Sequence, residues 1–434
     1  MMTTFFACDI SFSVRLPRSA LRSAHFFWRD TFGVVTREDA AQRSLIQGFL
    51  FELARTYGTP TYVYDLDKVS QQVSALRGAF PQTDLHPDIH YAVKANPCGA
   101  VLRHLAGHGL GAEVITLGEL ERALRAGFPP AHILLGGPKQ DSALRRRAVQ
   151  AGVKLVSLDS VSQWERWQKD LRKEVGVRFL VRLNPALDPR THEHLATGAA
   201  ESKFGMTLLE AQEVGEVLGD KLAGFHVHAG SQIADMNIYD EIFAALRPLY
   251  ERFPGATTLD LGGGFAVPDF PLERFAQKVA EFLKGLNVRL MLEPGRYLVA
   301  ESGVLLTRVL HVKKGALRHV IADAGMADLL RPALYSAAHP IRVLGHSDEE
   351  VELVEVDVDG PLCENADRLG RGIQLPEVAK GDLLVVEEAG AYGLTMASNY
   401  ASSLRPAEVV VQEGEARLAR RREEVADLWR LECE

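Results

Sequence analysis

Cysteine is scarce in this chain, which has four in 434 residues, none of them in a Cys-x-x-Cys pair. This scarcity excludes a disulfide-based scaffold and a cysteine-rich zinc site, and it suits a reducing cytoplasm. Long apolar runs are missing too, because no stretch approaches the eighteen residues of a transmembrane helix. Positive charge is not in excess, since 49 lysines and arginines face 57 acids and give a net charge of −8. We therefore expect a cytoplasmic protein that binds neither nucleic acid nor a membrane.

Composition and pattern divide the chain into four parts. Residues 1–47 carry five arginines before the first glutamate, which is typical of a disordered extension or, alternatively, of an organellar transit peptide. Residues 48–83 contain a short β-rich run at 59–67 that we expect to join a later β domain. Two larger domains follow, at residues 84–300 and 301–434.

Residues 84–300 alternate short apolar runs with segments of helical spacing. Such alternation predicts parallel strands joined by right-handed helical crossovers. Eight units in about 220 residues favour a (β/α)₈ barrel of the TIM type over a doubly wound open sheet. Gly127 follows one helical segment, where a glycine suits a helix C-cap. The expected strands lie at 89–95, 112–116, 132–137, 154–160, 178–185, 224–230, 257–263 and 289–296.

Residues 301–434 follow a different rhythm. Val354, Val356 and Val358 alternate with acidic residues, which is the period-two pattern of a half-exposed strand. Similar runs occur at 303–312, 319–325, 382–390 and 407–412 with few helical segments between them. The pattern predicts a C-terminal antiparallel β domain, closed by a charged helix at 417–429.

Unusual residues stand at the ends of four predicted barrel strands, where the reacting groups of such barrels lie. Lys94 interrupts the first apolar run, where an unpaired ammonium ion would be costly. It therefore either forms an ion pair at the rim of the barrel or bonds covalently to a carbonyl group. The sixth strand ends in His226 and His228, which could pair on a metal or face a flat ring. The loops after the sixth, seventh and eighth strands carry groups suited to an anion: Ser231, Gly262, Gly263, Gly264, Gly295 and Arg296.

These groups together describe a site for pyridoxal 5′-phosphate. A lysine can hold the cofactor aldehyde, and glycine N–H groups with an arginine can hold its phosphate. Glu293, beside Gly295, can pair with the pyridine nitrogen and keep it protonated. A protonated ring withdraws electrons from the bonds to Cα, so the site favours the breaking of such a bond.

The chain resembles the fold-type III pyridoxal-phosphate decarboxylases, and within them the diaminopimelate decarboxylases. The resemblance runs from about residue 50 to about residue 430, through motifs in the expected order. It implies the alanine racemase-like fold and decarboxylation of meso-2,6-diaminopimelate to L-lysine in lysine biosynthesis. The motifs are YAVKAN (91–96), GAEVITLGEL (111–120), SKFGM (202–206), HVHAGSQI (226–233), LDLGGGF (259–265), EPGR (293–296), DAGMADLLRPALY (323–335), GPLCENAD (360–367) and GAYG (390–393).

The resemblance also implies a role for each matching residue. Lys94 would bond to the cofactor, His228 would stack on its ring, and Glu293 would bind the pyridinium. The phosphate would lie against Ser231, the glycines 262–264, Gly295 and Arg296. Cys363 would donate the proton to Cα across the interface of a homodimer. The distal end of the substrate would contact Arg296, Arg331, Tyr335 and Glu364, and Tyr392 would touch both cofactor and substrate.

Other functions stay open at this point. A decarboxylase of ornithine, arginine or lysine would have no use for Arg331 and Tyr335, which match a distal-carboxylate site. A carrier-tethered amino acid remains an alternative, because Asn365 and Ala366 replace the small Ser or Gly residues usual after Glu364. A non-catalytic pyridoxal-phosphate-binding regulator would be expected to lack Lys94 or Cys363. A racemase is disfavoured because it would carry an arginine at Glu293.

Overall fold

The computed structural model describes residues 14–15, 37–80, 85–170, 176–186, 202–346 and 352–433. They form two compact units. The barrel unit holds Val69–Ser302 and Gly390–Thr395, and the β unit holds the described residues before Val69, Gly303–Ala389 and the residues from Met396 onward. No helix in these described parts is long and apolar enough to cross a membrane.

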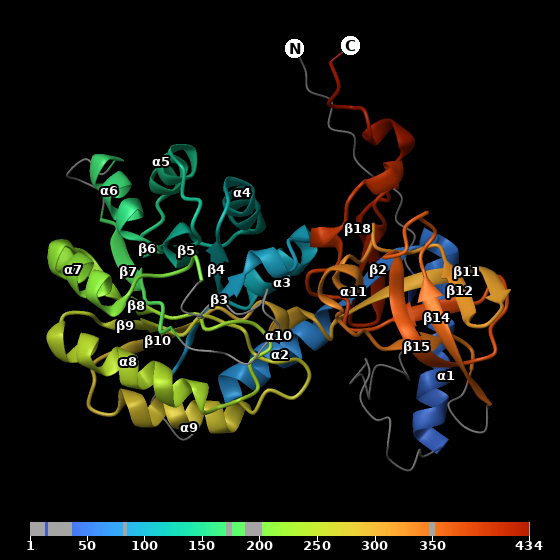
Figure 1. Cartoon of the computed structure of the whole chain (residues 1–434), viewed down its shortest axis with the longest axis horizontal. Helices are drawn as coiled ribbons and strands as arrows, with labels where there is room; N and C mark the ends of the chain where they lie inside the picture. Colours follow the sequence, from blue (N-terminus) through green and yellow to red (C-terminus); the bar gives the residue numbers. More distant parts are fainter. Residues whose placement is uncertain are drawn as a thin grey trace. The chain divides into compact units, whose positions relative to one another are not determined.

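The barrel unit is built around a closed barrel of eight parallel strands (Figure 1). Each strand pairs with its neighbour in sequence, and the pairing of Leu292 with Ile89 closes the ring between the last strand and the first. All eight strands overlap the predicted runs, so the predicted (β/α)₈ barrel is confirmed. They are β3 (Asp88–Ala92), β4 (Gly111–Val114), β5 (Ile133–Leu135), β6 (Leu155–Leu158), β7 (Arg178–Arg182), β8 (Leu222–His226), β9 (Thr258–Asp260) and β10 (Arg289–Leu292).

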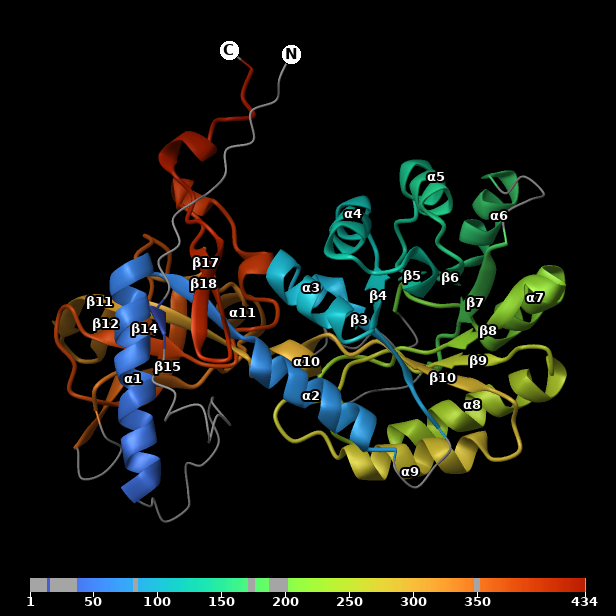
Figure 2. The same ribbon diagram turned by 180° about the vertical axis from the view of Figure 1, so that it is seen from behind.

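Helices surround this barrel, as the view from behind also shows (Figure 2). Local signals fix their ends: Thr116 caps the N-terminus of α4 by accepting a hydrogen bond from the Glu119 N–H, and Gly127 ends the helix with φ +96°. The C-cap predicted at Gly127 is therefore confirmed. The helices are α2 (Leu66–Gly78), α3 (Gly99–Gly107), α4 (Leu117–Ala126), α5 (Ser142–Ala151), α6 (Val161–Asp170), α7 (Leu208–Leu218), α8 (Ile238–Arg252), α9 (Leu272–Leu283) and the short α10 (Arg296–Val299).

The apolar faces of the helices pack outside the barrel. In α9 the side chains of Phe275, Val279 and Phe282 are buried, and Phe282 stacks on Phe243 of α8 with ring centroids 4.4 Å apart. Inside the barrel, strand side chains such as Leu180 and Met291 form a buried cluster. Packing on both sides of the strands leaves polar side chains to gather at the strand ends.

The β unit contains a ten-stranded sheet with β16 branching from β11. Its strand pairings are mostly antiparallel, but β2 pairs with β17 and β12 pairs with β14 in parallel. The predicted β domain is confirmed, but its sheet is mixed and not purely antiparallel, and the strand before the barrel joins it between β17 and β11. The strands are β1 (Val14–Arg15), β2 (Thr61–Asp65), β11 (Gly303–Lys314), β12 (Arg318–Ala322), β13 (Ile341–Val343), β14 (Leu353–Asp359), β15 (Arg368–Pro376), β16 (Leu383–Val386), β17 (Ala407–Gln412) and β18 (Glu415–Arg420).

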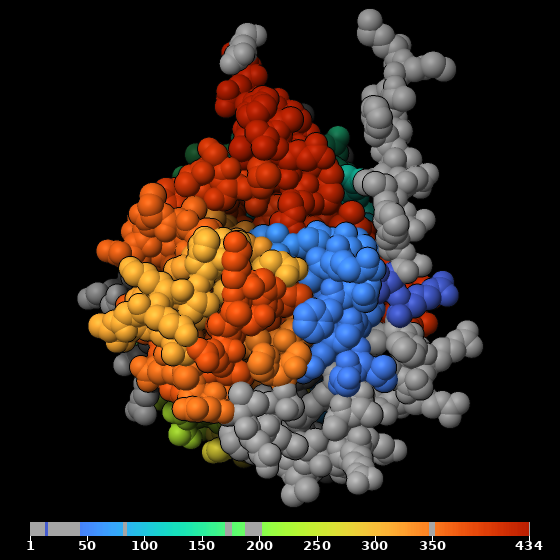
Figure 3. Space-filling model, turned by 90° about the vertical axis from the view of Figure 1, so that its right-hand side faces the viewer, coloured from blue at the N-terminus to red at the C-terminus, as the bar shows by residue number. Residues whose placement is uncertain are grey.

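Helix α1 (Arg37–Tyr57) packs on this sheet, and Figure 3 shows blue residues from the N-terminal part of the chain next to orange residues from its C-terminal part. Leu50 and Leu53 are fully buried in one core with Leu306 and Val409. Most of the predicted disordered extension at 1–47 lies outside the described residues. Within it, α1 begins at Arg37 and β1 pairs with β18, and the expectation of disorder stays a prediction.

The charged helix expected at 417–429 is wrong. Residues up to Arg420 form β18, which pairs with β17 so that Ala416 faces Val411 and Leu418 faces Val409. Its charged residues alternate with these apolar ones, and such alternation allows a strand. The remaining segment contains a single 3₁₀ turn, Val425–Asp427.

Candidate active site

Lys94 follows the first barrel strand and contacts a buried acid. It lies in the 3₁₀ turn Val93–Ala95, directly after β3. Its Nζ lies 2.8 Å from Oε2 of Glu113 on the neighbouring strand β4. Glu113 is 3% exposed, so its carboxylate needs a cation close by. The Lys94 side chain is 38% exposed, so Lys94 is a partly exposed lysine at the strand end that is paired with a buried acid.

The neighbours of Lys94 set its protonation state. Burial lowers the pKa of Lys94, but the charges of Glu113, Tyr392 and Glu293 raise it by more, so the net pKa lies above its usual value. The lysine is an ammonium ion at neutral pH while no group is bonded to it. An amine attacks a carbonyl only when it has lost this proton.

Replacing Glu113 with glutamine is expected to lower the pKa of Lys94. The amide has the shape of the carboxylate but no charge, so the neighbour that most raises the pKa of Lys94 loses its effect. Cofactor-free Glu113→Gln protein should therefore bond to pyridoxal phosphate at lower pH than wild type. The measurement is the pH dependence of cofactor fixed to Lys94 by borohydride, with the exposed Glu121→Gln as the matched control. An unshifted pH dependence would show that Glu113 does not govern the lysine.

Two acids and a histidine meet at the ends of β8, β9 and β10. Asp260 is fully buried, and its Oδ1 accepts a hydrogen bond from the Gly262 N–H at 2.8 Å. Burial, followed by the charges of Asp260 and Glu113, raises the pKa of Glu293 well above its usual value. Nε2 of His226 lies 3.9 Å from Oε1 of Glu293, and its Nδ1 lies 2.8 Å from the hydroxyl oxygen of Ser157. Of the described residues, His226, Asp260 and Glu293 also form the one group whose spacing could hold a metal ion.

His228 contacts the glycine loop that follows β9. Its Nδ1 accepts a hydrogen bond from the N–H of Gly263 at 3.2 Å. Burial, then the positive charges of Arg182 and Lys94, lowers the pKa of His228 well below its usual value, so the imidazole is neutral. Gly262 has φ +63°, and a Cβ there would lie 2.6 Å from Nδ1 of His228. The predicted glycine loop therefore lies directly against the predicted ring-stacking residue.

Arg296 begins α10 directly after the eighth strand. Its Nη2 lies 3.3 Å from Oγ of Ser231 in the loop after β8. Its guanidinium carbon lies 4.8 Å from the ring centroid of Tyr392. Tyr392 has φ +56° and donates its backbone N–H to the Ala95 carbonyl at 2.8 Å, which ties it to the turn that carries Lys94. Gly295, which precedes Arg296, lies close to Ala95.

Four other predicted residues lie in the β unit, in two groups. Arg331 and Tyr335 are the first and last residues of the short helix α11 (Arg331–Tyr335). They are four residues apart and so lie on one face of the helix. Arg331 is 8% exposed, and its Nη1 lies 3.2 Å from Nε2 of His339. Arg331 is therefore a buried arginine and does not form a surface ion pair of the usual kind.

Cys363 and Glu364 lie in the exposed loop between β14 and β15. Asp367 holds this loop from inside, because its Oδ2 accepts from the Leu362 N–H at 2.6 Å and its own N–H donates to the Glu364 carbonyl at 2.9 Å. Asn365 and Ala366, which replace the Ser or Gly residues usual in the family, lie in the exposed part of the loop. Asp367, which follows them, is the residue that holds the loop. The loop thus presents a thiol and a carboxylate side by side in sequence.

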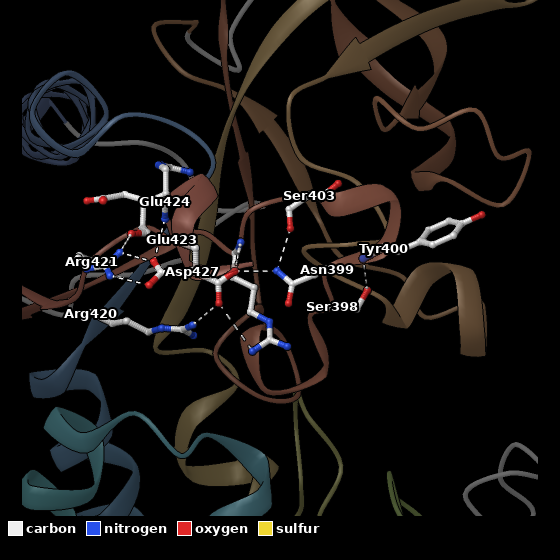
Figure 4. A network of polar contacts seen from close by, with 11 residues as sticks. Ser398, Asn399, Tyr400, Ser403, Arg420, Arg421, Glu423, Glu424 and Asp427 are labelled. Carbon is white, nitrogen blue, oxygen red and sulfur yellow. Dashed lines mark hydrogen bonds and ion pairs between the residues drawn. The ribbon is translucent and has the colours of Figure 1, made fainter. Parts of the chain in front are cut away.

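Tyr400, in a turn that hydrogen bonds stabilise, contacts this loop. Tyr400 is half exposed, and its hydroxyl lies 3.5 Å from Oε2 of Glu364. Asn399 fixes the turn by donating to the Ser403 carbonyl at 2.9 Å and to the Glu423 carboxylate at 2.7 Å (Figure 4). Sequence reasoning did not identify Tyr400, because nothing local distinguishes it from any other exposed aromatic residue.

The barrel residues fit the cofactor that the sequence resemblance implies. The predicted lysine, the neutral His228, the glycine loop with Arg296 and the acid Glu293 all lie at the same ends of the strands. Sequence reasoning missed Glu113 and Asp260, which set the charge of Lys94 and Glu293. Each is an acid in an apolar strand, the same signal that marked Lys94, and this pattern could have identified them.

Comparison with known proteins supports the same assignment. Residues 66–300 match the family of the pyridoxal-dependent decarboxylases, in its pyridoxal binding domain. Diaminopimelate decarboxylase from Deinococcus radiodurans is 38% identical over 90% of this chain and 100% of its own length. The same enzyme from Zymomonas mobilis is 37% identical over 88% of this chain and 94% of its own.

A solved structure extends the similarity to the fold. The crystal structure of diaminopimelate decarboxylase from Helicobacter pylori, complexed with L-lysine, superposes with a TM-score of 0.81. That protein is 35% identical to this chain, and the match covers 88% of this chain and 99% of the other. Both units are therefore shared with such enzymes, and the chain belongs to the diaminopimelate decarboxylase family of pyridoxal-dependent decarboxylases.

Proposed function

We propose that this protein decarboxylates meso-2,6-diaminopimelate to L-lysine with pyridoxal 5′-phosphate as cofactor. The observation that carries the proposal is the convergence of Lys94, Glu113 and Glu293 at the barrel end, in a chain 38% identical to a diaminopimelate decarboxylase. A barrel-end lysine with a buried acid opposite suits this cofactor, and the relative supports the substrate. The test is release of carbon dioxide from a panel of diamino acids.

The barrel residues hold the cofactor in this proposal. Pyridoxal phosphate, when bound, supplies an electron sink for the electron pair that remains when carbon dioxide leaves Cα. Lys94 holds it covalently, and neutral His228 packs against its ring. Glu293 pairs with the pyridine nitrogen and keeps it protonated. The phosphate lies against N–H and hydroxyl donors and one guanidinium: Ser231, Gly262, Gly263, Gly264, Gly295 and Arg296.

The β-unit residues complete the reaction in this proposal. Cys363 delivers the proton that replaces the lost carboxylate on Cα. Its exposed loop in a single chain supports a homodimer in which each subunit supplies Cys363 to the active site of its partner. Such sharing would leave either subunit inactive by itself.

Substrate selection rests on the far end of diaminopimelate, which carries a second amino group and a second carboxylate. Arg296 and Arg331, with the hydroxyl of Tyr335, bind that carboxylate, and Glu364 binds the amino group. Tyr392 contacts both substrate and cofactor. Lysine or ornithine as a substrate would lack the distal carboxylate and leave the arginines unpaired. This disfavours the alternative that the enzyme decarboxylates ornithine, arginine or lysine.

Arg331→Ala is expected to lower kcat/KM for diaminopimelate by one to two powers of ten. A hydrogen bond to a charged group contributes about 1.5–3 kcal/mol, and about 1.4 kcal/mol corresponds to tenfold. The absorbance of bound cofactor should not change. The matched control is Arg371→Ala, which removes an exposed arginine of β15. Wild-type turnover of lysine or ornithine at rates near that of diaminopimelate would contradict the distal-carboxylate role.

We also propose that the enzyme works in the cytoplasm and binds no nucleic acid. Within the described residues Cys98, Cys363 and Cys433 form no disulfide, which supports a reducing compartment. The net charge of −8 gives no attraction to a phosphate backbone. Fractionation of cells and a binding titration with DNA at low salt would test the two statements.

A further inference from the structure

A buried histidine lies behind the arginine proposed to select the substrate. His339 is 3% exposed and lies four residues after α11, just before strand β13. Its Nε2 lies 3.2 Å from Nη1 of Arg331. Its Nδ1 lies 2.9 Å from the backbone carbonyl oxygen of Glu387. Both ring nitrogens therefore have a partner, one on each side.

The two contacts determine the tautomer of His339. A carbonyl oxygen can only accept, so Nδ1 carries a hydrogen and donates it to Glu387. A guanidinium can only donate, so Nε2 must offer its lone pair to Arg331. A protonated imidazole would place a hydrogen on Nε2, facing the N–H of the guanidinium. Only the neutral ring with its hydrogen on Nδ1 satisfies both contacts.

The sheet fixes the carbonyl that orients the ring. Strands β13 and β16 pair in an antiparallel register that places Ile341 opposite Val386. The N–H of Glu387 donates to the Pro340 carbonyl at 2.8 Å. The Glu387 carboxylate also accepts from Nε of Arg342 at 2.6 Å. The position of the imidazole therefore follows from sheet pairing, and not from a mobile side chain.

We propose that His339 is a positioning residue that sets substrate specificity by orienting the guanidinium of Arg331 toward the distal carboxylate. The inference rests on the proposed function, because it needs Arg331 to bind that carboxylate. A long arginine side chain has several rotatable bonds, and holding it in one conformation costs entropy. The acceptor Nε2 restrains the guanidinium before substrate arrives, so less of this cost remains at binding.

Two small molecules separate this role from a general one in packing. Product lysine keeps the distal amino group and carboxylate of diaminopimelate, so it needs the oriented Arg331. Cadaverine has the same carbon chain and both amino groups but no carboxylate. Loss of the orienting contact should weaken lysine as an inhibitor and leave cadaverine unchanged. Damage to the fold would weaken both.

Two substitutions keep different halves of the imidazole. His339→Asn retains a donor near the position of Nδ1 and loses the acceptor toward Arg331. His339→Gln can place its carbonyl oxygen near the position of Nε2. We expect the asparagine variant to raise KM for diaminopimelate and the inhibition constant of lysine about tenfold, the loss of one charged hydrogen bond. The turnover number should change less than KM, and the glutamine variant should recover most of the loss.

Three outcomes would overturn the inference. The first is an asparagine variant whose lysine and cadaverine inhibition constants match wild type, and the second is a variant that weakens both inhibitors equally. The third is a glutamine variant that folds, as judged by its melting temperature, and recovers nothing. If the wild-type enzyme decarboxylates diaminopimelate, each of these outcomes refutes only the positioning role of His339 and leaves the proposed function intact. A wild-type enzyme inactive on diaminopimelate would instead refute the proposed function, and the inference with it.

Discussion

Lys94→Ala is expected to abolish covalent attachment of pyridoxal phosphate and to reduce turnover by at least about three powers of ten, within the range for loss of an acid–base or nucleophilic group. Lys94 is the lysine beside the buried Glu113, at the barrel end where the other residues proposed to hold the cofactor lie. Alanine removes the amine that bonds to the cofactor. The removal also leaves the Glu113 carboxylate buried without its cation, so the variant should be less stable.

The measurement is reduction with borohydride followed by mass spectrometry of the peptide that contains residue 94. Lys139→Ala is the matched control, because Lys139 lies in the same unit on an exposed ion pair with Asp141. It should keep the cofactor label and normal turnover. Cofactor that is still reducibly bonded to the Lys94→Ala protein would place the attachment on another lysine.

Cys363→Ala is expected to slow turnover by a factor of about 10²–10⁴ while cofactor binding is kept. The thiol is exposed on the loop that Asp367 holds in place, so alanine should not disturb the fold. Without the thiol, the electron pair left on Cα must wait for a proton from another donor. Steady-state release of carbon dioxide, together with the absorbance of bound cofactor, measures both effects.

Cys433→Ala is the control for this substitution, because Cys433 is also free and exposed in the β unit. Unchanged turnover of Cys363→Ala would move the proton transfer to Tyr392 or water. A shared active site adds a stricter test, in which Lys94→Ala and Cys363→Ala proteins are mixed and allowed to exchange subunits. Each mixed dimer would then hold one intact site and one site that lacks both groups. Failure to recover activity after proven exchange would argue against sharing.

The sequence by itself determined the architecture of the barrel and most of its candidate site. The strands are short apolar runs bounded by turns, and eight of them in order leave little choice of topology. Glycines 262–264 and Arg296 were recognisable because their type and their place after the seventh and eighth strands both point to an anion. Lys94 was recognisable because a lysine in an apolar run must have a partner. These inferences depend only on neighbours along the chain.

Only the tertiary structure decided which distant residues share a contact. Glu113 on β4 contacts Lys94, which follows the neighbouring strand β3. His339 contacts Arg331 because the pairing of β13 with β16 fixes the carbonyl that orients its ring. Residues 415–420 became a strand and not a helix because β17 offers them an edge to pair with. Charge and tautomer at each position follow from burial and from partners that lie far away in sequence. Local composition carries no information about either, so the protonation state of the site could be derived only from the folded chain.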